Sequence, residues 1–409
     1  MNDTSLNTRQ TPADLMLFAA DGEQASHYGQ HLARLGSTAA QARAGGLAAA
    51  IDWSRRHPSP EILLVDLDGD PLPLQSLAEL SEVCDPACHI IALGGKQDVD
   101  LYRSLLHSGV FDYLLKPVSL DLLASTLARA RGVGHGDPHG VRSGRTIAVT
   151  GSSGGCGTST VVAGLGLLLS QQRHTATAVV DFDRSNGDQN LLLGYDGEAG
   201  LAGALSSSEI DTRLLQRAMG RINERLHLLA QAPLLRNAAA FDSEHLLDLG
   251  GNLCRLFNQV IWDLPAGCPP GSLEVLAHAQ TRILLTDLSV QDARNLHRLL
   301  REIGDESEGQ QLLVVANAAR DHAAPVVERA QFEDFIERRI DLLLPHAGNA
   351  LATSLLAGPL RLEGAPAFQN ALLELADLAT GHTPKRNASV SGSLIARLKQ
   401  ALNRQRPAA

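Results

Sequence analysis

The residues best suited to chemistry lie in one stretch, from Ile147 to Thr160. An apolar run rich in β-branched residues leads into glycines, then into the hydroxyl residues Ser159 and Thr160, and then into a helical pattern. A strand, a glycine-rich loop and a helix in this order bind phosphate, because the loop amides and the helix N-terminus attract an anion. The residues expected to contact the phosphates or their metal ion are Gly154, Gly155, Cys156, Gly157, Thr158, Ser159 and Thr160.

This loop lacks a positive charge. The general motif is G-x-x-x-x-G-K-S/T, and Thr158 occupies the position of its lysine. The chain therefore keeps a backbone cradle for an anion without the motif's fixed cation. An ordinary glycine-rich turn between a strand and a helix is the alternative, so the interpretation depends on carboxylates further along the chain.

Carboxylates follow two later apolar runs. Asp181 and Asp183 come directly after the run from Ala176 to Val180, and Asp263 ends the run that begins at Val260. The C-terminal edge of a parallel sheet is where such folds bind ligands, and side chains two apart on a strand point the same way. We expect Asp181 and Asp263 to lie beside Mg²⁺ together with the Ser159 hydroxyl, and Asp183 to position a water. Ordinary polar strand ends are the alternative.

A third strand end carries Asn317, after the run from Leu312 to Ala316. Its amide offers a donor and an acceptor together, which suits the edge of a nucleotide base; a helix cap or turn is the alternative. Pro265 to Gly267 follow Asp263 and are expected to form a loop near the terminal phosphate. The order of strands and helices across residues 145–382 predicts one doubly wound, mostly parallel α/β domain.

The segment 14–131 also alternates between apolar runs and helical patterns, which predicts a second parallel sheet with helices on both faces. The expected strands are 15–19, 62–65, 90–93 and 111–115, and the expected helices are 23–35, 74–83, 99–107 and 120–130.

This first segment resembles a response-regulator receiver domain. The resemblance rests on Asp66 after one apolar run and on Lys116 before a proline after the last run. A receiver also holds Mg²⁺ with an acidic pair after its first strand, where this chain has Ala19 and Ala20, and Gly94 stands where a hydroxyl residue is expected. Asp66 and Lys116 are therefore predicted to be the equivalents of an acceptor site that is inactive, in a pseudo-receiver used for docking or dimerisation.

The loop, the two aspartate sites and Asn317 together resemble the MinD/ParA class of deviant-Walker ATPases. That class has a K-G-G-x-G-K-S/T loop, and both of its lysines are absent here, at Ser153 and Thr158. A receiver-like domain before such a degenerate loop resembles the TadZ/CpaE family of the tight-adherence (Flp, type IVc) pilus machinery. The resemblance implies a homodimer that binds ATP, contacts pilus and secretion proteins, and acts at a cell pole with slow or absent ATP hydrolysis.

Composition limits the possible partners and compartments. The chain has 409 residues and a formal net charge of −10, which argues against general nucleic-acid binding by the whole chain. Residues 1–13 are polar without the pattern of a signal peptide, and the apolar runs are too short to span a bilayer. Five unevenly spaced cysteines suit a reducing cytoplasm.

Two segments outside the expected domains have a distinct character. Residues 132–144 are rich in glycine and are predicted to form a flexible linker. The tail, 383–409, contains lysine and arginine but no aspartate or glutamate, and its apolar residues fall at helical spacing. We expect 390–406 to form a basic amphipathic helix that contacts the cytoplasmic face of the inner membrane; packing on a partner is the alternative.

Two other functions remain open at this stage. A working MinD/ParA-type ATPase would cycle on membrane or DNA, and the missing lysines and the acidic charge oppose it. A scaffold with an idle nucleotide site would have no physical need for the glycines, Ser159, Asp181 and Asp263.

Overall fold

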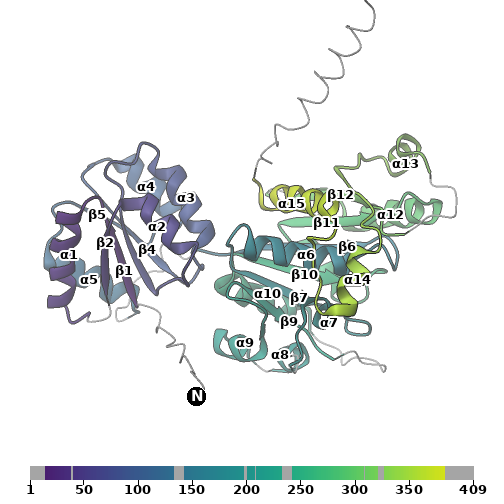
Figure 1. Cartoon of the computed structure of the whole chain (residues 1–409), viewed down its shortest axis with the longest axis horizontal. Helices are drawn as coiled ribbons and strands as arrows, with labels where there is room; N and C mark the ends of the chain where they lie inside the picture. The colour runs from purple at the N-terminus through teal and green to yellow at the C-terminus, as the bar shows by residue number, and fades with distance from the viewer. Residues whose placement is uncertain are drawn as a thin grey trace, which may run out of the picture.

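The computed structural model describes residues 14–37, 40–132, 142–197, 200–207, 209–232, 242–307, 309–320 and 327–382. The predictions for residues 1–13, for most of the linker and for the tail 383–409 fall outside this described part. The chain forms two α/β domains, each built on its own sheet with helices on both faces (Figure 1). The predicted fold class is confirmed.

The smaller domain has a five-stranded parallel sheet in the order β2-β1-β3-β4-β5. The central strands are buried on both faces, which explains why they are continuous apolar runs and not alternating patterns. The elements are β1 (Leu15–Ala19), α1 (Gly22–Arg34), β2 (Gln41–Ala44), α2 (Gly46–Ser54), β3 (Ile62–Asp66), α3 (Pro73–Val83), β4 (His89–Gly94), α4 (Val99–His107), β5 (Asp112–Leu115) and α5 (Leu120–Ala130).

The larger domain has an eight-stranded sheet in the order β13-β12-β11-β6-β10-β7-β9-β8, parallel except for the β8–β9 pair. β6 lies inside the sheet between β10 and β11, so the loop after it opens at the centre of the carboxyl edge. The strands are β6 (Arg145–Gly151), β7 (Thr177–Asp181), β8 (Gly220–Arg221), β9 (Leu226–Leu229), β10 (Gln259–Leu264), β11 (Thr281–Thr286), β12 (Gln311–Asn317) and β13 (Leu342–Leu344). The helices are α6 (Thr158–Gln171), α7 (Gln189–Leu193), α8 (Leu201–Ser206), α9 (Thr212–Ala218), α10 (Ser243–Leu256), α11 (Ser272–His278), α12 (Val290–Ile303), α13 (Arg329–Ile336), α14 (Ala350–Ala357) and α15 (Pro366–Thr380).

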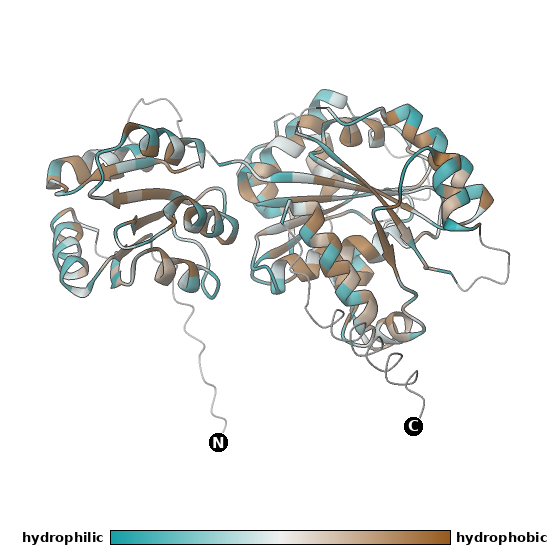
Figure 2. Ribbon diagram, turned by 90° about the horizontal axis from the view of Figure 1, so that it is seen from above, coloured by the Kyte–Doolittle hydropathy of each residue, from teal (hydrophilic) through white to brown (hydrophobic). Residues whose placement is uncertain are grey.

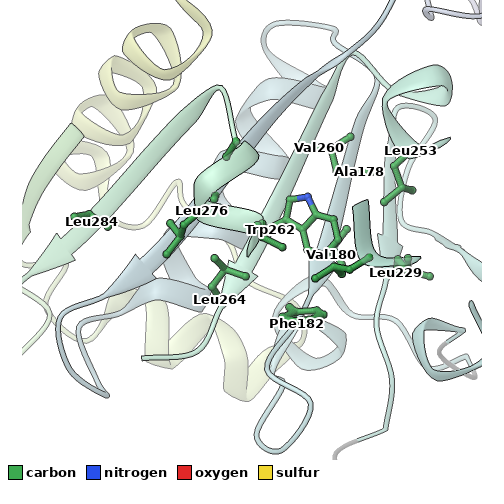
Figure 3. Close-up of a cluster of buried hydrophobic side chains, with 14 of the residues drawn as sticks. Ala178, Val180, Phe182, Leu229, Leu253, Val260, Trp262, Leu264, Leu276 and Leu284 are labelled. Atoms are coloured by element: carbon green, nitrogen blue, oxygen red, sulfur yellow. The ribbon is translucent and has the colours of Figure 1, made fainter. Parts of the chain in front are cut away.

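Each face of the larger sheet has its own core, and β10 contributes to both. Trp262 lies at the centre of one core, with Phe182 edge-on to its ring at 5.7 Å (Figure 3). Ile261, the preceding residue, belongs to the core on the opposite face. The central strands are largely apolar, whereas the helices also carry polar residues (Figure 2). This packing fixes the strand ends where the candidate site lies.

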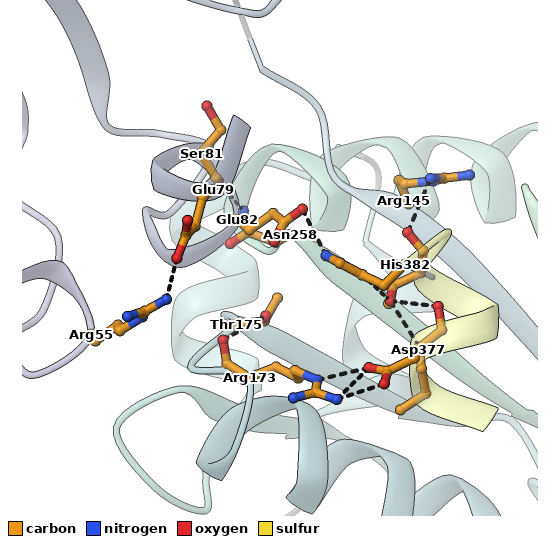
Figure 4. A network of polar contacts seen from close by, with 12 residues as sticks. Arg55, Glu79, Ser81, Glu82, Arg145, Arg173, Thr175, Asn258, Asp377 and His382 are labelled. Carbon is orange, nitrogen blue, oxygen red and sulfur yellow. Dashed lines mark hydrogen bonds and ion pairs between the residues drawn. The ribbon is translucent and has the colours of Figure 1, made fainter. Parts of the chain in front are cut away.

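The two domains meet where side chains of the larger domain reach main-chain carbonyls of the smaller one. Arg225 is buried, and its guanidinium donates to the carbonyls of Val83 and His57, at 2.9 and 3.0 Å, and to that of Ser54. The Asn258 amide donates to two further carbonyls at the end of α3, including that of Ser81 at 3.0 Å (Figure 4).

Within the described residues, no helix combines the length and apolar character needed to cross a membrane.

Candidate functional site

The glycine-rich loop joins β6 to α6, as the sequence predicts. Gly157 is the N-cap of α6 with a φ of 81°, and Gly155 has a φ of 85°. A side chain at Gly157 would place its Cβ 2.6 Å from the amide nitrogen of Asn317, so close packing as well as backbone conformation requires glycine there. The loop therefore presents main-chain N–H groups at the start of a helix, which is the arrangement that binds phosphate.

Asn317 ends β12 beside this loop. Its side-chain Nδ2 donates to the Cys156 carbonyl at 2.8 Å, and the residue is buried. A cavity of about 250 Å³ opens next to it, between Gly157 and Thr160 on one side and the segment 345–348 on the other. Asn317 thus braces the loop at the mouth of a partly apolar cavity that suits a base.

Two buried carboxylates lie at the ends of neighbouring strands. Asp181 on β7 and Asp263 on β10 are paired in register, and each is only 2% exposed. Burial, together with the charge of Asp263, raises the pKa of Asp181 to about 8. Burial also raises the pKa of Asp263, to about 6, against hydrogen bonds from Gln189 and Ser159 that lower it. A divalent cation beside these oxygens would hold both carboxylates ionised.

Gln189, which the sequence analysis did not single out, connects these groups. Its main-chain N–H donates to Asp181 Oδ2 at 3.0 Å, while its side-chain Nε2 donates to Asp263 Oδ2 at 2.7 Å and to the Ser159 carbonyl at 3.0 Å. Its Oε1 is buried with no hydrogen-bond donor among the described residues. A metal-bound water would supply such a donor, so the residues present fit Mg²⁺.

Part of this chain is similar to known proteins in sequence and in fold. No protein-family model matches the chain. The septum site-determining protein MinD of Synechocystis sp. is 27% identical over 195 residues, which is 47% of this chain and 71% of that protein. The chain spans 57% to 71% of the length of the curated MinD relatives that it matches. A ParA family ATPase from Chlorobium tepidum TLS superposes with a TM-score of 0.52 at 23% identity, covering 57% of this chain and 98% of its own.

Part of the chain is therefore similar in sequence to MinD proteins and shares its fold with a ParA family ATPase. A pilus assembly protein CpaE from Caulobacter crescentus CB15 is also similar, at 31% identity over 29% of this chain and 93% of its own, with a TM-score of 0.27.

Both lysine positions of the MinD/ParA loop hold short neutral side chains. The Ser153 hydroxyl donates to Asp292 Oδ1 at 2.5 Å, and the Ser152 hydroxyl donates to the same atom at 2.8 Å. The Thr158 hydroxyl lies beside Gly151: a Cβ added at Gly151 would be only 2.9 Å from the Thr158 hydroxyl oxygen. The two serine hydroxyls anchor the loop to Asp292, and neither Ser153 nor Thr158 supplies a cation to a triphosphate.

Asp183 lies differently from the prediction. β7 ends at Asp181, so Asp183 does not share its strand face. The Asp183 carboxylate instead accepts hydrogen bonds from the N–H groups of Ser185 and Asn186, at 3.2 and 2.9 Å. The charge of Asp183 still raises the pKa of both Asp181 and Asp263, so Asp183 lies near these two carboxylates, and its role toward water stays a prediction.

The receiver-like site in the smaller domain is closed on itself. Asp66 is buried, its Oδ2 accepts from the Ala20 N–H at 3.0 Å, and it forms an ion pair with Lys116. Lys116 also contacts Asp68 at 3.0 Å. Burial lowers the pKa of Lys116, but its hydrogen bonds to Asp66 and Asp68 outweigh burial, so the pKa is raised overall. These contacts occupy the acceptor-equivalent carboxylate from within the protein.

Two neighbouring residues of that site also depart from a receiver. Asp21, the acid nearest the missing pair, is the N-cap of α1 and accepts from the Gln24 N–H at 2.8 Å. At Gly94, an added Cβ would lie 2.6 Å from the Tyr113 hydroxyl, so the tyrosine fills the space of the expected hydroxyl residue. Both observations support the prediction of a pseudo-receiver.

Proposed function

We propose that this protein is an ATP-binding factor that localises or assembles a Flp (tight-adherence) pilus secretion apparatus, with slow or absent ATP hydrolysis. The observation that carries the nucleotide part is the glycine cradle of the MinD/ParA-like domain beside the buried pair Asp181 and Asp263. The pilus part rests on the sequence resemblance: a receiver-like domain precedes a loop that lacks both lysines. The protein acts as a homodimer on the cytoplasmic side of the membrane, at a pole.

The chain's own residues divide the work of holding Mg-ATP. Main-chain N–H groups of the loop bind the phosphates, and Ser159, Asp181 and Asp263 hold the metal ion. Bound Mg²⁺ would neutralise charge on the phosphates and on these carboxylates together. Asn317 orients the base at the mouth of its cavity.

Slow hydrolysis follows from the two missing lysines. Each lysine would make a charge-assisted contact of roughly 1.5–3 kcal/mol with the phosphates. If both contacts strengthen in the transition state, their loss slows hydrolysis by very roughly 10²–10⁴-fold. A protein that binds ATP and seldom hydrolyses it remains in one nucleotide state for long periods, which suits a localisation factor better than a rapidly cycling one.

Isothermal titration calorimetry of the full chain with ATP tests the nucleotide part. We expect saturable binding below millimolar ATP that weakens at least about tenfold when Mg²⁺ is removed. Asp263→Asn should abolish most of the Mg²⁺ dependence, whereas Asp334→Asn, an exposed acid on α13, should leave it unchanged. The absence of heat at millimolar ATP, with and without Mg²⁺, would contradict the proposal.

An active MinD/ParA-like ATPase that cycles on membrane or DNA is the second candidate. The retention of Asp183 beside Asp181 and Asp263 favours it. The net charge of −10 opposes the DNA form of this candidate.

A further inference from the structure

An arginine from another part of the chain contacts the glycine-rich loop, and the loop motif does not predict this contact. Arg320 follows β12 by three residues, and its guanidinium donates to the Gly154 carbonyl. The same group covers Gly155, where an added Cβ would be 2.8 Å from Nη2 and 3.3 Å from Nε. The guanidinium therefore occupies space that a side chain at position 155 would fill.

The segment from Asn317 to Arg320 runs along one side of the loop. Asn317 contacts Cys156 near the base cavity, and Arg320 contacts Gly154 two residues closer to β6. A nucleotide whose base occupies that cavity extends its phosphates along the loop away from Gly157. Arg320 consequently lies toward the end of the site where the outermost phosphate is held.

The charge of the site makes a cation at this position valuable. Two buried carboxylates, Asp181 and Asp263, are paired in register at the predicted metal position. A third, Asp292, bonds to Ser152 and Ser153 of the loop. Burial alone would raise the pKa of Asp292, but hydrogen bonds from three serines, together with the charge of Arg320, lower it, so this carboxylate is an anion. A triphosphate adds further negative charge, and the two lysine positions hold Ser153 and Thr158.

We propose that Arg320 supplies the cationic phosphate contact that the loop has lost, by pairing with the outermost phosphate of bound ATP. The inference rests on the proposed function, since it names a further binding residue of that site. A guanidinium has five N–H donors in a planar fork, and the Gly154 carbonyl is a neutral acceptor that a phosphate readily displaces. Arg320 is exposed, so its side chain is free to follow the ligand.

This placement predicts that Arg320 distinguishes ATP from ADP. ADP lacks the outermost phosphate, so a residue that contacts this group strengthens ATP binding far more than ADP binding. A residue that merely braces the loop would affect both nucleotides equally, because the inner phosphates depend on the same main-chain N–H groups.

The test compares Mg-ATP and Mg-ADP dissociation constants of the full chain by calorimetry. For Arg320→Ala we expect ATP affinity to fall about 10- to 100-fold and ADP affinity to fall less than about threefold. Arg320→Lys should lie between this variant and the unaltered protein, because it keeps the charge and loses the fork. Arg294→Ala, an exposed arginine on α12, is the charge-matched control and should change neither constant.

The outcomes separate this inference from the proposed function. If the unaltered protein binds ATP and Arg320→Ala binds it equally well, the inference is wrong and the proposed function stands. An equal loss for ATP and ADP also overturns it, because the arginine then only braces the loop. If the unaltered protein binds neither nucleotide, the proposed function fails, and the inference fails with it.

Discussion

The position of Asp183 bears directly on catalysis. Its carboxylate accepts from two N–H groups of the turn that follows it, so the side chain is held in place and partly occupied. A general base needs a free oxygen within hydrogen-bond reach of the attacking water. Oδ1 of Asp183 accepts both of these bonds, so the predicted role toward water would fall to Oδ2.

A single-turnover assay with Mg-ATP measures what this arrangement achieves. We expect the unaltered protein to hydrolyse ATP far more slowly than about one per second, because the lysine contacts are missing. Asp183→Ala should then reduce a rate that is already low, while Asp196→Ala, in a loop of the same domain, serves as the control. If ATP turned over at about one per second and Asp183→Ala abolished this turnover, the active-ATPase candidate would be favoured instead.

Individual site residues differ in how far the sequence predicts them. Asp181, Asp263 and Asn317 end apolar runs, and parallel strands bring such ends to one edge, so a local pattern was enough to place them together. Arg320 contacts Gly154 across 166 positions, and Gln189 contacts Asp263 across 74. Neither contact leaves a local signal, because each depends on how a loop is folded over the sheet edge.

At the scale of elements, α12 is bonded to the glycine-rich loop through one carboxylate. Asp292 is buried in the first turn of α12 and accepts from the hydroxyls of Ser152, Ser153 and Ser289, at 2.8, 2.5 and 2.6 Å. Ser289 is also the N-cap of α12. The helix start and the loop therefore share a hydrogen-bond network, and a shift of one element displaces the other.

Removal of this carboxylate should loosen the loop. Asp292→Ala leaves buried hydroxyls without their acceptor, and we expect a loss of about 1–3 kcal/mol in the free energy of unfolding. Amide exchange of residues 152–157 should become faster, as measured by hydrogen–deuterium exchange with mass spectrometry. Asp305→Ala, beyond the far end of α12, is the matched control. Unchanged exchange in the loop would show that the main chain alone holds its conformation.

The elements that the sequence missed have identifiable reasons. β2 has the sequence QARA, is mostly exposed and pairs only with β1, so it carries no apolar run. β13 is short and begins only at Leu342, because Asp341 just before it bonds to β12 in another way. The Asp341 N–H donates to the Val314 carbonyl at 2.8 Å, and the Asp341 carboxylate accepts from the Val314 N–H at 2.7 Å. Buried central strands were predictable because burial on both faces dictates their composition.

At the scale of the whole molecule, side chains of the larger domain cap the C-terminal ends of helices in the smaller domain. The last carbonyls of a helix lack partners within it and carry partial negative charge. The Arg225 guanidinium reaches such carbonyls at the ends of α2 and α3, and Arg142 adds bonds to the carbonyls of Ser81 and Cys88, at 3.0 and 2.8 Å. Glu82 and His382 add a contact of 2.8 Å at the edge of this surface (Figure 4). The smaller domain is thus held largely through its main-chain carbonyls, at residues separate from its acceptor-equivalent site.

Arg225→Ala should weaken this contact by about 2–4 kcal/mol, because several charge-assisted bonds are lost together. Each domain contains one of the chain's two tryptophans, so single-tryptophan variants report thermal unfolding separately by fluorescence. Trp53, on α2 beside the contact, stacks on His57, whose carbonyl Arg225 binds. We expect Arg225→Ala to lower the unfolding midpoint reported by Trp53 more than that reported by Trp262, while the exposed Arg221→Ala leaves both unchanged. Equal midpoints in Arg225→Ala and the unaltered protein would mean that the smaller domain does not depend on this contact for its stability.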